Sequence, residues 1–257
     1  MNISSDPASQ STATPNVRRV PAGRIVSWLH SGWRDVVANP IPSLAYGLLF
    51  GIGGDLILLA SLGRPHLFTA ALSGFFLLAP LLAVGLYELS RRHATGIRPT
   101  FIDSLQAFRS NGRSIALFGL ALGTVTLIWE RASVVGFELL GGTHGVNVRQ
   151  FISEAIASSD NTIFLVLWFV LGGMLALVTY AFSIVTVPLM VDRDADFVTA
   201  VLASLRAFAA NTMTLLAWGA TIVVLTLLGF ATLLFGLVII MPVLGHASWH
   251  AYRDLVE

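Results

Sequence analysis

The sequence predicts an all-α fold, a polytopic membrane helix bundle of about six transmembrane helices arranged as three hairpin repeats with cytoplasmic interfacial amphipathic helices. First, its 257 residues are 55% hydrophobic and only 11% charged, with a mean hydropathy of +0.79. A soluble domain is about 25% charged, so lipid is the expected solvent for this surface. Second, several apolar stretches reach the roughly 20 residues that a spanning helix needs. Third, the arginines between these stretches are distributed unevenly.

The N-terminal segment, residues 1–22, differs from the rest of the chain in composition. It is rich in Ser, Thr, Pro, Asn and Gln and lacks the apolar core of a secretory signal. Such a composition is typical of a disordered tail. We therefore expect one integral membrane domain over residues 23–257.

The apolar stretches define the spans in order. Four of them cover residues 41–62, 67–90, 114–135 and 162–191. The last stretch, 213–249, would be about 55 Å long as one helix, against a hydrocarbon core of about 30 Å. We expect it to fold back near residues 229–236 and give spans 213–230 and 232–250. The alternative is a single long or broken helix.

The arginines predict the orientation, because positive charge near span ends favours the cytoplasmic side. With six spans, the side opposite the termini holds three arginines, Arg64, Arg131 and Arg149. The side of the termini holds twelve: Arg18, Arg19, Arg24, Arg34, Arg91, Arg92, Arg98, Arg109, Arg113, Arg193, Arg206 and Arg253. Both termini are therefore expected in the cytoplasm of a bacterium, with the chain in the inner membrane. A short outer helix is expected at 148–157.

An internal repeat organises the chain. The segment 104–111, SLQAFRSN, recurs as 204–211, SLRAFAAN, and a Gly follows eight residues after each Asn. A weaker copy precedes the first span. Each unit consists of an amphipathic surface helix, an asparagine, a span, and a return span with one proline: Pro80, Pro188 and Pro242. The alternative explanation is coincidence within ordinary membrane-helix composition. For the prolines, fixed bends are favoured over hinges.

Five segments carry a resemblance to a known family. They are Gly32-Trp33-Arg34-Asp35, LAYGLLF at 44–50, GLYELSRR at 85–92, Asp192-Arg193-Asp194 and GHASWHAYR at 245–253. With them the chain resembles the bacterial integral-membrane family catalogued as domain of unknown function 2189. The resemblance implies the membrane fold and carries no activity.

Three charged residues fall inside predicted spans, where charge is costly and often functional. Asp55 lies in the first span; a carboxyl that is protonated or near the outer interface is favoured over a proton or cation relay. Glu130 and Arg131 lie in the outer part of the third span. For these two, a structural ion pair is favoured over a substrate site.

The C-terminal ends of the return spans hold the polar residues that most suggest chemistry. His246 and His250 are four apart and share one face of a helix, a spacing that can hold a metal but is a weak signal by itself. The corresponding stretches of the other units contain Tyr87 with Glu88, and Asp192 with Asp194. If three units pack around one axis, these groups converge as a polar or cation cluster. A hydrogen-bonded ring that fixes the span ends is favoured over a metal site.

Composition excludes several classes of function. The chain has no Cys, and its net charge of +1 gives no basic face for nucleic acid. All six histidines lie at or near predicted interfaces, which disfavours haem, and no cofactor is expected. A non-catalytic accessory or assembly protein of the inner membrane is favoured, contacting the lipid bilayer and a larger membrane complex. The alternatives are a transporter or channel for a small solute or ion, and a lipid-directed membrane enzyme.

Overall fold

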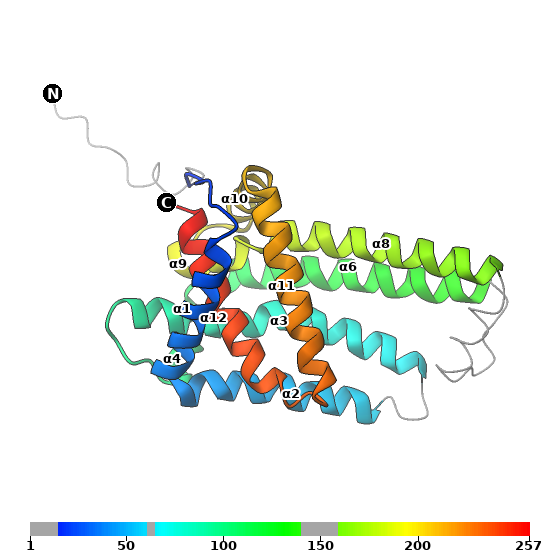
Figure 1. Ribbon diagram of the computed structural model, residues 1–257, viewed down its shortest axis with the longest axis horizontal. Coiled ribbons are helices and arrows are strands. Elements are labelled where there is room, and N and C mark those ends of the chain that lie inside the picture. The colour runs from blue at the N-terminus through cyan, green and yellow to red at the C-terminus, as the bar shows by residue number, and fades with distance from the viewer. Residues whose placement is uncertain (1–14, 61–64, 140–158) are drawn as a thin grey trace.

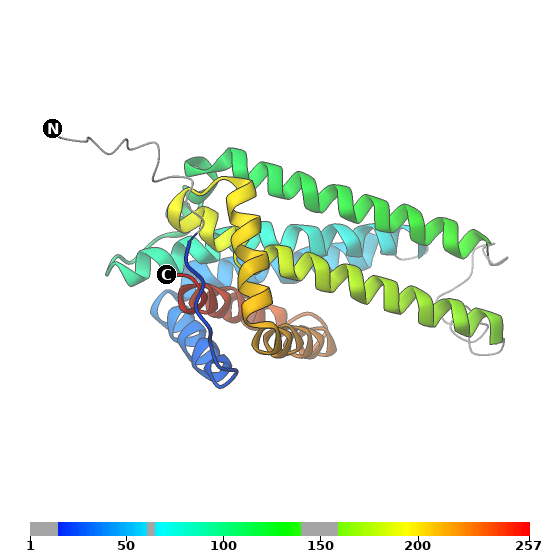
Figure 2. The same cartoon turned by 90° about the horizontal axis from the view of Figure 1, so that it is seen from above.

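Long helices arranged along one axis dominate the computed structural model, which describes residues 15–60, 65–139 and 159–257. The helices α2, α3, α6 and α8 run along the long axis in both views (Figures 1 and 2). The shorter helices and the C-terminus gather at one end, on the left of Figure 1. The bounds are α1 Arg24–Ala38, α2 Pro40–Ala60, α3 Pro65–Ala94, α4 Phe101–Ser104, α5 Ala107–Ser110, α6 Gly112–Leu139, α8 Ser159–Ser183, α9 Thr186–Arg193, α10 Phe197–Ala210, α11 Thr212–Ala231 and α12 Leu237–Leu255. The all-α prediction is confirmed.

Membrane-spanning helices are present among the described residues. Three segments are long and apolar enough to cross a bilayer: Gly112–Ser133, Val166–Arg193 and Thr212–Ala231. A fourth is reached if Arg24–Ala38 and Pro40–Leu56, which meet at 109°, count as one broken span. The predicted spans 114–135 and 213–230 match α6 and α11. The predicted span 67–90 lies inside α3, with Pro80 within the helix.

The last apolar stretch folds back, as expected, so the alternative of one long helix is wrong. Leu233 and Leu234 adopt positive φ angles of 52° and 68° in the turn between α11 and α12. The Thr232 hydroxyl donates to the Gly229 carbonyl and accepts from the Gly236 amide, each at 2.8 Å. A Cβ on Gly236 would meet the Thr232 Oγ1 atom at 2.4 Å, so this tight turn needs a glycine there. The final helix continues to Leu255, beyond the predicted end at 250.

The predicted span 162–191 is interrupted, which the sequence did not indicate. α8 ends at Ser183, and α9 begins at Thr186 with Pro188 in its first turn, where a proline is tolerated. Ser204 of α10 satisfies the backbone at the break. Its hydroxyl accepts from the Val185 amide at 3.1 Å and donates to the Ala181 carbonyl at 2.7 Å.

Helix α12 makes its most extensive contacts with α1 and α2, and glycines allow the close approach. A Cβ on Gly32 of α1 would lie 2.6 Å from the Val243 carbonyl oxygen. A Cβ on Gly47 of α2 would lie 1.9 Å from the Val238 carbonyl oxygen. That carbonyl lies four residues before Pro242, which has no amide hydrogen to donate to it. α12 is thus held against the two helices that precede and follow the 109° bend.

The two ends of the described chain lie together. Val17 and Val256 form an isolated antiparallel bridge. The Arg18 amide donates to the Leu255 carbonyl at 2.9 Å, and the Glu257 amide donates to the Asn16 carbonyl at 3.0 Å. Residues 15–22 of the predicted tail are therefore held against the C-terminus, which differs from a disordered segment. Residues 1–14 and the expected outer helix at 148–157 lie outside the described residues.

Candidate functional site

A buried carboxylate, Asp35 of α1, lies at the centre of a polar network between four helices. It is only 6% exposed. The Ser90 hydroxyl of α3 donates to Asp35 Oδ2 at 2.6 Å, and His250 Nε2–H of α12 donates to the same oxygen at 3.0 Å. Burial raises the pKa of Asp35, but the hydrogen bonds from His250 and Ser90 and the nearby His246 outweigh burial and hold the pKa below its ordinary value. Asp35 is therefore an anion.

The network continues inward through His246, which is 1% exposed. Its Nδ1 atom lies 2.7 Å from Ser90 Oγ, and its Nε2 atom lies 3.0 Å from Ser43 Oγ of α2. The single hydroxyl proton of Ser90 is donated to Asp35. The Ser90 oxygen therefore accepts a hydrogen bond from His246 Nδ1–H. The Nε2 atom of this neutral imidazole is then the acceptor, and Ser43 donates to it. In this series of hydrogen bonds, each group donates to the next one, and the last acceptor is the Asp35 carboxylate.

The helices reach these positions because small residues let them approach. His246 and His250 share one face of α12, and the neighbouring Gly245 lies so close to α3 that a Cβ there would be 2.5 Å from a methyl carbon of Leu86. Gly32 gives α1 the same close approach to α12 one turn before Asp35. The network thus joins α1, α2, α3 and α12 at the end of the molecule where the termini lie.

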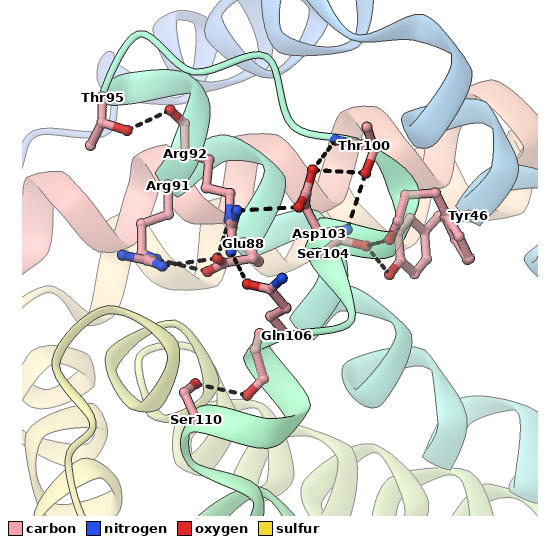
Figure 3. A network of polar contacts seen from close by, with 12 residues as sticks. Tyr46, Glu88, Arg91, Arg92, Thr95, Thr100, Asp103, Ser104, Gln106 and Ser110 are labelled. Carbon is pink, nitrogen blue, oxygen red and sulfur yellow. Dashed lines mark hydrogen bonds and ion pairs between the residues drawn. The ribbon is translucent and has the colours of Figure 1, made fainter.

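Glu88 of α3 forms a second polar group (Figure 3). It is 2% exposed and pairs with Arg91 Nε at 2.7 Å and with Arg92 Nε at 2.6 Å. Arg92 also donates to Gln106 at 2.6 Å and lies 3.5 Å from Asp103, which forms the capping box of α4. This group ties the end of α3 to the short helices that follow it.

Asp192 and Tyr252 join α9 to α12 in a third group. The Tyr252 hydroxyl donates to Asp192 Oδ2 at 2.7 Å, and Arg253 donates to the same oxygen at 3.2 Å. The hydrogen bond to Glu88 is the main cause that raises the pKa of Arg91, and the negative charges of Asp192 and Asp194 raise it further. Asp194 ends α9 in the left-handed region, with φ of 50°. Tyr87 stacks on Trp249 with ring centroids 6.5 Å apart.

The predicted cluster at the ends of the return spans is therefore divided. His246 and His250 belong to the Asp35 network, Glu88 is bound by arginines, and Asp192 is bound by Tyr252 and Arg253. Within the residues that the structure describes, no group of three or more His, Asp or Glu side chains is arranged to hold a metal ion.

The predicted intramembrane charges stay apart from these groups. Asp55 is exposed on α2, Arg131 is exposed on α6, and Glu130 is half-buried. Among the described residues, no ion pair joins any two of the three. Glu130 and Arg131 are adjacent in a helix, and adjacent helical side chains point in different directions.

The sequence reasoning missed three members of the network, Asp35, Ser43 and Ser90. Helical periodicity puts Asp35 on the polar face of an amphipathic helix, but in the structure Asp35 is buried because the histidine pair of α12 packs against it. One signal was available: Gly32 precedes Asp35 by three residues, which is the spacing of a close helix contact next to a buried polar group.

Two pockets accompany the network. One, of about 600 Å³, lies beside Asp35 and is lined by Trp33, Arg34, His93 and His250 among others. The other, of about 620 Å³, is mainly apolar and lies between α3, α6, α8 and α12, where Trp129, Trp168 and Tyr87 contribute to its wall. Both volumes fall in the range of ligand pockets.

Long apolar helices with ionised groups gathered at one end define the class: this is a helical integral membrane protein. The model of the family described as predicted integral membrane protein (DUF2189) matches residues 67–192 of the chain. The matched segment begins in α3 and ends in α9. Neither the search of curated proteins nor the search of solved structures gave a match.

Proposed function

We propose that this protein is a non-catalytic accessory or assembly protein of the bacterial inner membrane. It crosses the membrane six times, has both termini in the cytoplasm, and receives an apolar segment of a partner complex in the pocket between its hairpins. The observation that carries the proposal is that apolar pocket of about 620 Å³.

The adjacency of the chain ends supports an even number of crossings. The bridge between Val17 and Val256 favours an arrangement with both ends on one side of the membrane. Three spans would place them on opposite sides. Six spans, formed by the hairpins α2–α3, α6–α8 and α11–α12, satisfy this constraint, and the twelve arginines on the side of the termini favour the cytoplasm for that side.

Two asparagines support the repeat. Asn111 donates to the Ala195 carbonyl at 2.8 Å, in the segment that enters α10. Asn211 accepts from the Val20 amide at 2.7 Å, in the segment that enters α1. Each asparagine therefore binds the segment leading into the surface helix of the next unit, and the third unit binds the first.

The pocket lies between the two helices of the α6–α8 hairpin, with α3 and α12 also contributing to its wall. On α8, Gly172, Leu175 and Thr179 share one face and are half-buried. On α6, Leu122, Thr126 and Trp129 share the opposing face. Exposed side chains such as Leu171 and Val178 lie on the other side of α8, toward lipid. The pocket face is thus distinct from the lipid face, as a docking site for an apolar segment requires.

The polar residues fit a structural role better than a catalytic one. The Ser43–His246–Ser90–Asp35 chain contains the residue types of a hydrolase site, but Ser43 is fully buried and its proton is directed to His246. A nucleophile must reach its substrate. This series of hydrogen bonds therefore holds α1, α2, α3 and α12 together and preserves the shape of the apolar pocket.

Site-specific photo-crosslinking in native membranes tests the proposal. A benzoylphenylalanine probe replacing Leu175 is expected to give a protein adduct of one defined mass. The same probe replacing Leu171, on the lipid face, is the matched control and is expected to give lipid adducts. Ala176→Trp, which fills the pocket, should abolish the protein adduct. Only lipid adducts at both positions would contradict the proposal.

Transport of a proton or small cation is the second candidate, favoured by the directed hydrogen-bond chain from Ser43 to Asp35. It predicts that the purified protein alone dissipates an imposed pH gradient in liposomes, and that His246→Phe stops this flux. A tight vesicle with the wild-type protein excludes proton transport.

A further inference from the structure

The pocket beside Asp35 has the composition of a site for a charged headgroup. Trp33 and Arg34 of α1 line it, together with His93 of α3 and His250 of α12. The Arg34 side chain is exposed and has no ion-pair partner within the described part of the chain. Asp35 lies at the back, 6% exposed, with one oxygen already engaged by Ser90 and His250. The groups left to face a ligand are therefore the Arg34 guanidinium and the His93 ring, whose Nε2 atom lies 3.9 Å from the second Asp35 oxygen.

Two residues that line the pocket, Trp33 and Val37, are exposed apolar side chains, and Ile41 follows them in the chain at the start of α2. Trp33 is 49% exposed, Val37 60% and Ile41 82%. Farther along α2, Leu48 and Ile52 are also exposed and lie on the same face as Ile41, at spacings of seven and four residues. A charged pocket that opens onto an apolar track matches the two parts of a phospholipid. Trp at this boundary is typical of the membrane interface.

We propose that this pocket binds one anionic phospholipid of the cytoplasmic leaflet. The phosphate lies against Arg34, with His93 as a further donor, and one acyl chain follows Ile41, Leu48 and Ile52 along α2. Guanidinium–phosphate hydrogen bonds are charge-assisted and among the stronger polar contacts. The helix that carries Arg34 and the helix that carries Ile41, Leu48 and Ile52 meet at a bend of 109°.

This site is separate from the apolar pocket between the hairpins, so the two proposals fail independently. The phospholipid site is lined by α1, the end of α3 and α12, and it faces the surface helix. No side chain lines both pockets. A result on lipid binding therefore leaves the partner proposal unchanged.

Lipid titration of the purified full-length protein in a neutral detergent tests the assignment. Short-chain phosphatidylglycerol is added, and bound lipid is counted by native mass spectrometry, with short-chain phosphatidylcholine as the zwitterionic comparison. We expect phosphatidylglycerol to bind more tightly. Arg34→Gln should weaken it about tenfold, the effect of losing one charge-assisted hydrogen bond. His93→Gln is a second variant that should also weaken it.

Arg206→Gln is the matched control, because Arg206 is likewise an exposed arginine of a surface helix. It should leave the affinity for phosphatidylglycerol unchanged. Equal losses for Arg34→Gln and Arg206→Gln would show unspecific attraction and overturn the proposal. Displacement of the lipid by inorganic phosphate alone would overturn it as well, because the site would then recognise a free anion.

Discussion

Replacing Gly47 by Ala should separate α2 from α12. An ideal Cβ on Gly47 lies 1.9 Å from the Val238 carbonyl oxygen, 2.7 Å from its carbonyl carbon and 3.0 Å from Pro242 Cγ. Two of these atoms belong to the backbone, so no side-chain rotation relieves the clash. To reach ordinary contact distance, the helices must move apart by about 1.5 Å. Overpacking of this kind costs about 1–3 kcal/mol, and the rigid backbone places Gly47→Ala at the upper end.

Thermal unfolding in detergent, followed by circular dichroism, measures this loss. For a chain of this length, a loss of about 2–3 kcal/mol lowers Tm by roughly 4–12 °C. Gly173→Ala in α8 is the matched control, because a Cβ there meets nothing within 4 Å. It should leave Tm unchanged or raise it slightly, since Ala is the better helix former. Equal Tm values for the two variants would refute the reasoning that α2 and α12 touch through Gly47.

Three further predictions concern polar contacts. Ser204→Ala should lower the free energy of unfolding by about 1–3 kcal/mol, because the Val185 amide loses its acceptor; chemical denaturation in mixed micelles measures it, and an unchanged midpoint would contradict it. The folded-state pKa of Asp35 is below its ordinary value of 3.8, so its stabilisation is present above that value and is lost as the pH falls through the folded pKa. Asp35→Asn should flatten this acid limb of Tm against pH, and an identical limb in the variant would exclude Asp35 as its source. Tyr252→Phe should cost about 1 kcal/mol and speed amide exchange near Asp192, while unaltered exchange would show that this hydrogen bond does not hold α9.

Features determined by local composition were predictable from the sequence. The fold-back between α11 and α12 follows from the length of one apolar stretch against the thickness of a bilayer, with Gly229 and Gly236 marking the turn. The length of the apolar stretch 114–135 likewise predicted the position of α6 to within a few residues. These conclusions need only the identity of the solvent and the length of the helix.

Features determined by distant partners were not predictable in the same way. The break between α8 and α9 falls within a continuous apolar run, and it depends on Ser204, which lies about twenty residues later and supplies the missing hydrogen bonds. Pro188, which has no amide hydrogen for the Ile184 carbonyl, predicts a bend here, but it does not predict that the helix ends at Ser183. Helical periodicity therefore cannot predict a break at which a side chain of another helix makes hydrogen bonds with the backbone.

The candidate site was predicted in part for the same reason. The sequence indicated that His246 and His250 share a face and lie near other polar groups. It did not indicate that Asp35 is buried, because helical periodicity compares a residue only with its own helix. The residue that buries Asp35, His250, is 215 positions away in the chain. Arg91 and Arg92 follow Glu88 by three and four residues, and side chains at these spacings are neighbours on a helix.

The most direct test of the account is the side of the membrane on which the two chain ends lie. The chain has no cysteine, so single cysteines at Asn16 and at Glu257 can be labelled without background, with Ser159→Cys at the start of α8 as the comparison for the opposite side. A membrane-impermeant maleimide should label both ends only in inverted vesicles, and Ser159→Cys only in intact cells. Labelling of the two ends from opposite faces would contradict both the pairing of Val17 with Val256 and the six-span arrangement.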